Sequence, residues 1–254
     1  MPESPFDLSG KTILVTGASS GIGRATAIVL SKLGATVVLA GRREDALRDT
    51  LSSISGEGHL IEPFDLSDTD AIPAWVGRIC AQTKKPLNGM VHAAGISITV
   101  PLRVQSRKHL DEVMVANVYS SFALLRAFSS KLNAAEGASL VLLSSISSLA
   151  GCTGFTAYAA SKGALNSLIL SASRELAPRK IRVNCLAPTY VTGTPMMDRQ
   201  VDEVPGESVQ KFQSDSFLGF PTAQEVAGSA AFLLSDAART ITGVTLPIDG
   251  GFLC

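Results

Sequence analysis

Apolar runs of strand length alternate with longer helical patterns from one end of this chain to the other. Lys11–Thr16 is a short apolar run, and residues 21–33 follow it with apolar side chains at helical spacing. Parallel strands that are covered on both faces have this β-branched and Leu-rich character. The alternation therefore predicts an α/β fold with a doubly wound parallel sheet of seven strands and helices on both faces.

The other elements are predicted from the same periodicities, and no linker divides the 254 residues. The remaining strands are expected at 36–40, 58–63, 88–92, 138–144, 181–186 and 244–248. The remaining helices are expected at 43–53, 68–83, 106–134, 157–177 and 223–234. Residues 189–222 lack clear periodicity, which favours a substrate lid over ordinary packing. We therefore expect a single domain, 1–254, with a lid at about 189–222.

The charge content is low and balanced, with 22 basic and 22 acidic residues and 17% charged side chains. Soluble domains average about 25% charge, so we expect buried surface in subunit contacts. A neutral chain lacks the basic excess that nucleic acid binding needs. Because no signal peptide or membrane span of about 18 residues is recognisable, we expect a cytoplasmic protein that does not engage a membrane.

The four cysteines are scattered along the chain without the spacing of a metal site or a redox motif. They are Cys80, Cys152, Cys185 and Cys254. We expect buried, reduced thiols and no bound metal.

A glycine-rich turn follows the first predicted strand and opens the first predicted helix. The segment 16–23 reads TGASSGIG. Glycines there allow a tight turn and a close approach of the backbone to a pyrophosphate, whose charge meets the N–H groups at the helix start. The spacing differs from GxGxxG, so the turn predicts dinucleotide binding only in this strand-to-helix context.

The end of the second predicted strand indicates which dinucleotide binds. An NAD site usually has a carboxylate there for the ribose 2′-hydroxyl, whereas this chain has Arg42 and Arg43. Two guanidinium groups suit the 2′-phosphate of NADP(H), although they could also lie solvated at a helix start. Asp65 and Leu66 follow the third strand, where they could meet the adenine, or Asp65 could cap the next helix.

Tyr158 and Lys162 are four residues apart, on one face of a predicted helix, and Ser145 follows an earlier strand. For a phenol with a pKa near 10 to titrate near neutrality, its phenolate must be stabilised over its neutral form by roughly 4 kcal/mol. A neighbouring ammonium group could supply part of this. A Tyr–Lys pair alone is common on protein surfaces, so the argument depends on its combination with Ser145 and the glycine turn.

These motifs, together with Asn117 in the preceding long helix and the closing segment 241–251, resemble the short-chain dehydrogenase/reductase family in its single-domain, Rossmann-type form. The resemblance extends over essentially the whole chain. It implies that Tyr158 is the general acid or base, Ser145 holds the substrate oxygen, and Lys162 lowers the Tyr158 pKa and binds the nicotinamide ribose. It also implies that Asn117 positions a water leading from Lys162 to solvent.

The resemblance also indicates further contacts for the cofactor. The expected cofactor-binding residues are Gly17, Ser19, Ser20, Gly21, Ile22, Gly23, Arg42, Arg43, Asp65, Leu66, Ala93, Ala94, Gly95, Asn117, Tyr158, Lys162, Pro188, Val191 and Thr194. The sequence departs from the usual family pattern at two positions near these residues. His92 stands where the family often has Asn, and we expect it to be a packed strand histidine.

The second departure is Thr189, which stands where Gly commonly follows Pro188, and it restricts the backbone beside the nicotinamide. The segment 192–194 reads TGT, so Thr192 and Thr194 both remain candidates for the family's pyrophosphate-contacting threonine.

The substrate is expected to be a small ketone or alcohol. Ser147, Phe155, Met196 and Met197 are candidate contacts, and Phe212 and Phe217 suggest an apolar lid. Such family members often reduce 3-oxoacyl thioesters. Arg179 could contribute to a cationic patch for an acidic carrier protein, but residues 133–137 lack the basic pair expected for one. Steroids, cyclic ketones, sugars and acyl chains all remain open.

Two other functions are disfavoured by the sequence. A nucleotide-sugar epimerase or dehydratase would resemble the extended branch of the family, with TGxxGxxG spacing and an added substrate domain. A non-catalytic NADP sensor would be expected to lack Tyr158 or Lys162, and both are present.

The expected helices at 106–134 and 157–177 are apolar around much of their circumference, as buried helices are. The resemblance implies that they form the contact of a homodimer, often within a tetramer of 222 symmetry.

Overall fold

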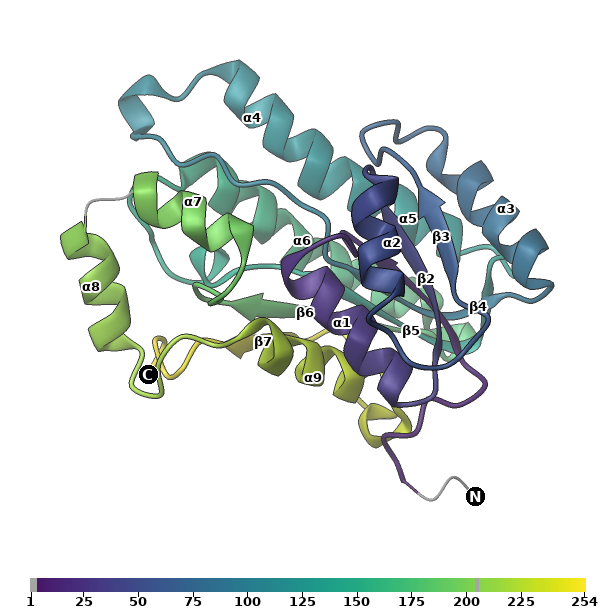
Figure 1. The fold of residues 1–254 in the computed structure, drawn as a ribbon. Helices are drawn as coiled ribbons and strands as arrows, with labels where there is room; N and C mark the ends of the chain where they lie inside the picture. Colours follow the sequence, from purple (N-terminus) through teal and green to yellow (C-terminus); the bar gives the residue numbers. More distant parts are fainter. Residues whose placement is uncertain (1–3, 204–205) are drawn as a thin grey trace.

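The computed structural model describes residues 4–203 and 206–254, and in it all seven predicted strands form one parallel sheet (Figure 1). Their spatial order is β3-β2-β1-β4-β5-β6-β7. The bounds are β1 Thr12–Thr16, β2 Thr36–Gly41, β3 Leu60–Pro63, β4 Leu87–His92, β5 Ala134–Leu143, β6 Arg182–Pro188 and β7 Thr245–Ile248. The order reverses between β1 and β4, so the predicted doubly wound topology is confirmed.

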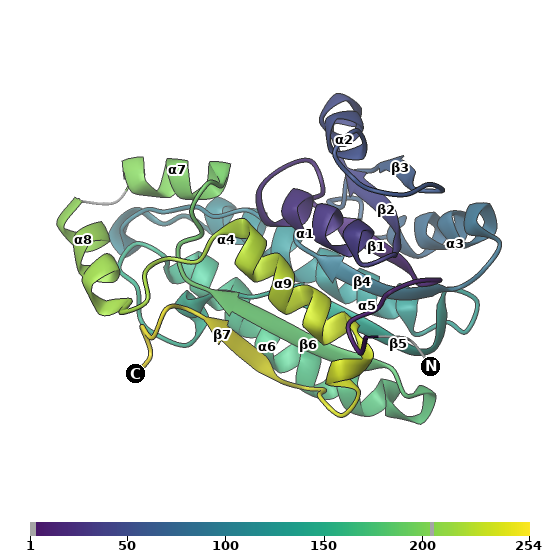
Figure 2. The same cartoon turned by 60° about the horizontal axis from the view of Figure 1, so that its bottom comes forward.

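Helices cover both faces of this sheet. Their bounds are α1 Gly21–Lys32, α2 Glu44–Leu51, α3 Ile72–Thr83, α4 Arg107–Val113, α5 Ser120–Phe128, α6 Thr156–Leu176, α7 Pro195–Glu203, α8 Gly206–Asp215 and α9 Ala223–Leu234. Helices α1 and α9 lie side by side on one face, whereas α3, α5 and α6 pack on the other (Figure 2).

The core consists of one apolar layer on each face of the sheet. In β1, Ile13 and Val15 belong to the layer beneath α1 and α9, and Leu14 belongs to the opposite layer. Trp75 of α3 and Phe128 of α5 are the largest side chains of the second layer, and both are fully buried. Side chains of a strand alternate between faces, so each strand contributes to both layers.

The prediction of one regular helix at 106–134 is wrong, because the helical segment ends earlier and is not a continuous α-helix. The structure has α4, then a π-helical segment at Met114–Tyr119, then α5, which ends at Phe128. Beyond it, Asn133 donates from Nδ2 to the Ala127 carbonyl at 3.0 Å, and Arg179 donates to the carbonyl of Ser129 at 2.9 Å. These side chains satisfy carbonyl groups at the helix end, and the chain then enters β5 at Ala134, four residues earlier than predicted.

The segment predicted to lack periodicity, 189–222, is instead partly helical. It contains α7 and α8, which lie together at one end of the molecule, near the C-terminus (Figure 1). Met197 and Gln200 of α7 face the body of the protein, whereas Asp198 and Arg199 are exposed. The helices are short and carry few apolar residues, which explains why no helical pattern stands out in the sequence.

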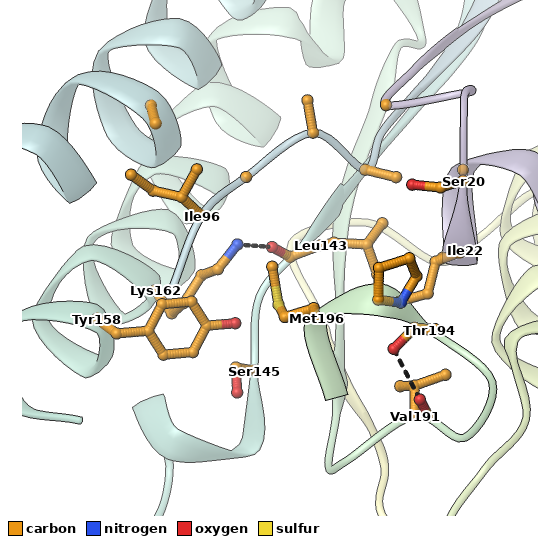
Figure 3. A pocket seen from close by; sticks show the side chains of 18 of the residues that line it. Ser20, Ile22, Ile96, Leu143, Ser145, Tyr158, Lys162, Val191, Thr194 and Met196 are labelled. Carbon is orange, nitrogen blue, oxygen red and sulfur yellow. Dashed lines mark hydrogen bonds between the residues drawn. The ribbon is translucent and has the colours of Figure 1, made fainter. Parts of the chain in front are cut away.

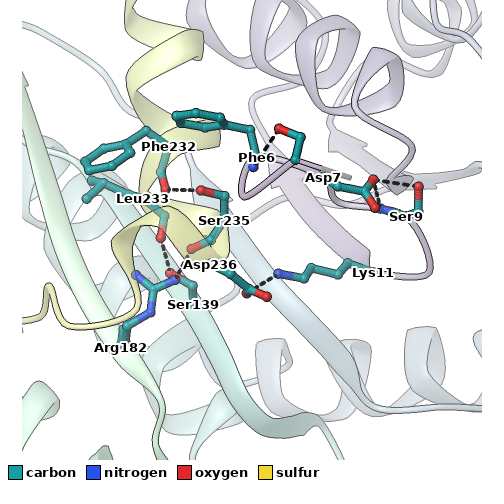
Figure 4. Close-up of polar contacts among 11 residues, drawn as sticks. Phe6, Asp7, Ser9, Lys11, Ser139, Arg182, Phe232, Leu233, Ser235 and Asp236 are labelled. Carbon is teal, nitrogen blue, oxygen red and sulfur yellow. Dashed lines mark hydrogen bonds and ion pairs between the residues drawn. The ribbon is translucent and has the colours of Figure 1, made fainter. Parts of the chain in front are cut away.

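Polar contacts anchor the end of α9 near the amino ends of the strands (Figure 4). Arg182 donates to the Ser235 carbonyl at 3.1 Å, Ser139 Oγ donates to the Leu233 carbonyl at 2.8 Å, and Lys11 pairs with Asp236 at 2.9 Å. The other end of the strands, their carboxyl ends, remains available for a binding site.

The prediction that every cysteine is buried is only partly correct. Cys80 and Cys185 are buried and Cys152 is half-buried, but Cys254 is exposed, because it lies at the C-terminus. All four are free thiols. Within residues 4–203 and 206–254, no helix has the length and apolar character to cross a membrane, and no group of His, Cys, Asp and Glu is arranged to hold a metal.

Candidate active site

A cavity of about 910 Å³ opens at the carboxyl ends of the strands. Loops that follow six different strands contribute to its wall: Gly17 after β1, Arg42 after β2, Asp65 after β3, Ala93 after β4, Ser145 after β5 and Thr189 after β6. The cavity spans the point between β1 and β4 where the strand order reverses, which is where doubly wound sheets bind their ligands.

Ser145, Tyr158 and Lys162 meet on one wall of this cavity (Figure 3). Tyr158 and Lys162 project from consecutive turns of α6, and the Lys162 ammonium lies 5.5 Å from the centre of the Tyr158 ring. Ser145 precedes the short 3₁₀ turn Ile146–Ser148 beyond β5. Lys162 Nζ also donates to the Leu143 carbonyl at 2.7 Å, which ties α6 to the end of β5.

Burial governs the acid-base properties of this wall. Burial raises the pKa of the Tyr158 phenol to about 12, although its hydrogen bond with the Ser145 side chain lowers it. Burial also lowers the pKa of the Lys162 ammonium to about 8. Both shifts have the sign expected when a charged form loses water. Tyr158 is therefore a protonated donor at neutral pH, beside a lysine that can still carry charge.

Asn117 lies behind the cavity wall instead of lining it. Its Oδ1 accepts from the backbone N–H of Ile96 at 2.9 Å, and its Nδ2 donates to the Ile96 carbonyl at 3.0 Å and to Ser161 Oγ at 2.9 Å. Its own carbonyl accepts from Ser121 Oγ at 2.6 Å. The Asn117 side chain thus holds the segment after β4 against α6. Asn117 itself belongs to the π-helical segment, which the sequence analysis did not predict.

The glycine turn has the geometry that close packing demands. A Cβ atom at Gly17 would lie 2.8 Å from the Ala94 nitrogen, and one at Gly23 would lie 2.2 Å from the Gly17 carbonyl oxygen. Ser20 caps α1 without a side-chain hydrogen bond, and the first turn carries no acidic residue. The N–H groups at the start of α1 therefore face the cavity without a side-chain acceptor, which fits the pyrophosphate of a dinucleotide.

Arg42 and Arg43 are exposed at the far end of the same cavity. The ion pairs among the described residues do not include either guanidinium. The pKa of Asp65 is lowered chiefly by the backbone N–H of Ser67, with a smaller contribution from the charge of Arg42. Asp65 thus accepts from its own turn, and the two arginines remain able to bind an anion.

Apart from Thr192 and Phe217, every other residue expected in the site lines this cavity; Phe217, expected in an apolar lid, is exposed. The set comprises Gly17, Ser19, Ser20, Gly21, Ile22, Gly23, Arg42, Arg43, Asp65, Leu66, Ala93, Ala94, Gly95, Ser145, Ser147, Phe155, Tyr158, Lys162, Pro188, Val191, Thr194, Met196 and Met197. Thr194 is buried, and its Oγ1 donates to the Val191 carbonyl at 2.8 Å, whereas Thr192 does not line the wall. Thr194 is therefore the better placed of the two threonines.

Comparisons with known proteins agree with this geometry. Residues 17–253 match the family model described as enoyl-(acyl carrier protein) reductase. An NAD-dependent glycerol dehydrogenase of Listeria innocua is 31% identical, with 98% of this chain and 96% of that protein covered. The 3-oxoacyl-[acyl-carrier-protein] reductase FabG of Rickettsia felis is 34% identical, with 98% and 99% covered. The chain belongs to the short-chain dehydrogenase/reductase family.

Solved structures of short-chain dehydrogenases/reductases share the fold. A candidate NAD(P)-dependent gluconate 5-dehydrogenase of Beutenbergia cavernae, with NADP bound at low occupancy, superposes with a TM-score of 0.89 at 33% identity. The match covers 98% of this chain and 99% of that one. As a family member, this protein is an oxidoreductase that uses a nicotinamide cofactor and acts on alcohol or ketone groups of a small molecule.

Several residues that line the cavity of this short-chain dehydrogenase/reductase were not anticipated from its sequence, and two of them make defined contacts. Tyr190 packs edge-on against Phe212, with ring centres 5.3 Å apart, and Gln200 of α7 donates to Ser97 Oγ at 3.1 Å. Gln200 could have been recognised because it is three residues after Met197, on the same helix face. Tyr190 lies two residues beyond the end of β6, where loops of such sheets contact ligands.

Proposed function

We propose that this protein is an NADP-dependent carbonyl reductase or alcohol dehydrogenase that interconverts a ketone and a secondary alcohol. The observation that carries the proposal is the meeting of Ser145, Tyr158 and Lys162 on one wall of the cavity. The same cavity contains the start of α1, where the cap residue makes no side-chain hydrogen bond. A phenol, a hydroxyl and an ammonium together suit proton transfer to a carbonyl oxygen.

The roles follow from the environments of the three side chains. When bound, NADP(H) supplies or accepts the hydride at the substrate carbon. Tyr158, whose pKa is raised to about 12 by burial, holds its proton at neutral pH and donates it to the carbonyl oxygen. Ser145 donates a hydrogen bond to the same oxygen, and the Lys162 cation stabilises the phenolate that Tyr158 becomes. In the reverse direction the phenolate is the base.

Asn117 acts from behind the wall in this proposal. It holds Ile96, which lines the cavity, and it reaches α6 through Ser161. Ser161 Oγ in turn donates to the Tyr158 carbonyl at 2.7 Å. A role for Asn117 in leading a water to Lys162, which the family resemblance implies, remains a prediction.

Selectivity for NADP(H) rests on Arg42 and Arg43. Both line the cavity beyond β2 with exposed guanidinium groups, and Gly41 ends that strand without a carboxylate. Arginine binds phosphate through two parallel hydrogen bonds. The NADP-bound structure from Beutenbergia cavernae supports this assignment, whereas the glycerol dehydrogenase relative is described as NAD-dependent, so the cofactor preference needs a direct test.

The substrate end of the cavity is mainly apolar and lies under α7 and α8, which we assign as the lid of a single-domain enzyme. Phe155, Tyr158 and Tyr190 form one apolar cluster with Met197 and Phe212. The tie from Gln200 to Ser97 connects α7 to the segment after β4. A small or medium-sized ketone with an apolar body fits these contacts.

A 3-oxoacyl thioester reductase is the second candidate, because FabG is among the relatives. Two contacts disfavour an acidic carrier protein as its partner. Arg179 is engaged with carbonyl groups at the end of α5, and Lys180 pairs with Glu136 at 2.9 Å. Two of the cations near α6 that could attract a carrier are thereby partly occupied.

The direct test follows NADPH absorbance with a panel of ketones, including cyclohexanone, acetophenone, ethyl acetoacetate and an acetoacetyl thioester. We expect turnover of at least one free ketone. Turnover of the thioester alone would favour the second candidate, and bound NADPH without any turnover would indicate a non-catalytic NADP-binding protein.

A further inference from the structure

Asn166 lies one helical turn beyond Lys162 and two turns beyond Tyr158 on α6. Residues four apart share a helix face, so the three side chains form one row. Tyr158 and Lys162 line the cavity, whereas Asn166 does not. Its amide instead reaches the end of β5, the turn that follows Ser145, and strand β7.

The amide of Asn166 is used as both acceptor and donor. Its Oδ1 accepts from Ser144 Oγ at 2.8 Å and from Thr245 Oγ1 at 3.2 Å, and its Nδ2 donates to Ser148 Oγ at 2.9 Å. Ser148 Oγ then donates to the backbone carbonyl of Ser145 at 2.6 Å. A hydroxyl has one proton, so Ser148 accepts from Asn166 and donates to Ser145, and the direction of the relay is fixed.

This relay joins the two elements that carry the reacting side chains. Tyr158 and Lys162 belong to a single helix, so their spacing is set by that helix alone. Ser145 belongs to the chain after β5, and its position relative to α6 depends on contacts between the two elements. The strand end itself touches α6 through Ser144 Oγ, which lies 3.2 Å from the Lys162 carbonyl. The turn beyond it is tied to α6 through Ser148.

We propose that Asn166 is a positioning residue, which fixes Ser145 at the distance from Tyr158 and Lys162 that the reaction requires. An amide suits this place because it accepts from two hydroxyl groups and donates to a third. Leucine has a similar size but makes none of these bonds. Displacement of a reacting group by about 1 Å can lower a rate by roughly a hundredfold. The inference rests on the proposed function, in which Ser145 holds the carbonyl oxygen.

The test compares Asn166→Leu, Ser148→Ala and the double variant with the wild type. Ser148→Ala removes one half-buried hydroxyl and keeps Asn166, so it tests the relay even where the larger change weakens folding. Ser167→Ala is the matched control, because Ser167 is the next residue of α6 and is exposed. Each variant is measured for kcat and KM with NADPH and the best ketone of the panel, and for NADPH affinity by fluorescence.

Both single variants are expected to lower kcat by about tenfold to a hundredfold, with NADPH affinity changed by less than about twofold. The double variant is expected to lose no more than the worse single variant, because residues that act through one relay are not additive. Ser167→Ala is expected to match the wild type. Unchanged kcat in Ser148→Ala, or losses that add in the double variant, would overturn the proposal.

Hydrogen–deuterium exchange gives a readout that does not depend on turnover. The peptide that contains residues 144–150 is expected to exchange faster in both single variants, with no change in the glycine turn at 16–23. Unchanged exchange at 144–150 would also overturn the proposal. Tyr158→Phe, measured in parallel, separates the two questions: if that variant keeps its turnover, the proposed function fails, whatever Asn166 does.

Discussion

The imidazole of His92 lies 2.7 Å from the hydroxyl of Thr16, between Nδ1 and Oγ1, in the buried layer behind the glycine turn. The Ala94 backbone N–H donates to the same hydroxyl at 3.3 Å, so the Thr16 proton is directed to Nδ1. On the other side, Nε2 lies 3.2 Å from Ser120 Oγ, which donates to the Ala116 carbonyl. This chain of donors fixes His92 as a neutral ring with its proton on Nε2.

His92 is therefore expected to make the protein sensitive to acid. Burial, and then the charge of Lys162, lower its pKa from 6.5 to about 3. Between about pH 6.5 and pH 3, the His92 imidazole is protonated in the unfolded chain but neutral in the folded protein. The free energy of unfolding should therefore fall by about 1.4 kcal/mol for each pH unit of acidification in this range. His92→Asn, whose side chain does not titrate, should show a shallower fall.

Urea unfolding at several pH values between neutrality and pH 4 measures this slope. His109→Gln is the control, because His109 is only partly buried and lies in the capping box of α4. A fall of equal steepness in His92→Asn and the wild type would contradict the assignment.

Removal of the Tyr158 hydroxyl should abolish most of the turnover. Tyr158→Phe keeps the ring that packs against Phe155 but loses the proton donor, and general acid catalysis is worth about a hundredfold or more. NADPH affinity should change little. Steady-state rates and fluorescence titration check the two expectations, with exposed Tyr119→Phe as the control. Near-normal turnover in Tyr158→Phe would rule out the proposed mechanism.

NADPH should bind at least about tenfold more tightly than NADH, since hydrogen bonds to charged groups contribute about 1.5–3 kcal/mol. Arg42→Ala and Arg43→Ala should weaken NADPH binding selectively and leave NADH binding nearly unchanged. Calorimetric titration with both cofactors measures this. Arg48→Ala is the matched control, because Arg48 lies nearby on α2 and is paired with Glu44. Equal affinities for the two cofactors in the wild type would contradict the role of the arginines.

Ketone reduction should decline as the pH rises through about 8, the value to which burial lowers the pKa of Lys162. Below it the ammonium is charged and can stabilise the Tyr158 phenolate; above it the charge is lost. The Tyr158 proton remains in place, because its pKa is about 12. Lys162→Arg, with a group that does not titrate in this range, should react more slowly but lack this decline. A flat wild-type profile of kcat/KM to pH 10 would contradict the prediction.

The apolar surface of α5 and α6 should be covered by a second copy of the chain. Phe122 is 56% exposed and Leu170 is 55% exposed, so both apolar side chains meet water in the single chain. Burial of such side chains contributes about 1.5–3 kcal/mol each. We expect a dimer or tetramer in analytical ultracentrifugation, and dissociation in Phe122→Asp and Leu170→Asp. Lys32→Asp, on α1 across the sheet, should leave the assembly unchanged, and a stable wild-type monomer at micromolar concentration would refute the expectation.

Local patterns were sufficient to predict the framework of the fold. Strand positions follow from short β-branched runs, and α9 was predicted with its observed bounds from its helical periodicity. The structure adds that Thr222 and Glu225 form a capping box at its start. The end of α5 could not be predicted in the same way. Arg179, fifty residues beyond Ser129, supplies hydrogen bonds there, and no local pattern carries that information.

The sequence by itself determined the order of elements, the glycine turn, the two arginines, and the spacing of Tyr158 and Lys162, because each depends on residues close together in the chain. Only the tertiary structure decided how Ser145 is tied to the helix that carries the other two groups. It also decided the burial that shifts their pKa values, the position of Asn117 behind the cavity wall and the helical form of α7 and α8. Those features arise from contacts between distant segments, and such contacts exist only after the sheet has brought the carboxyl ends of its strands together.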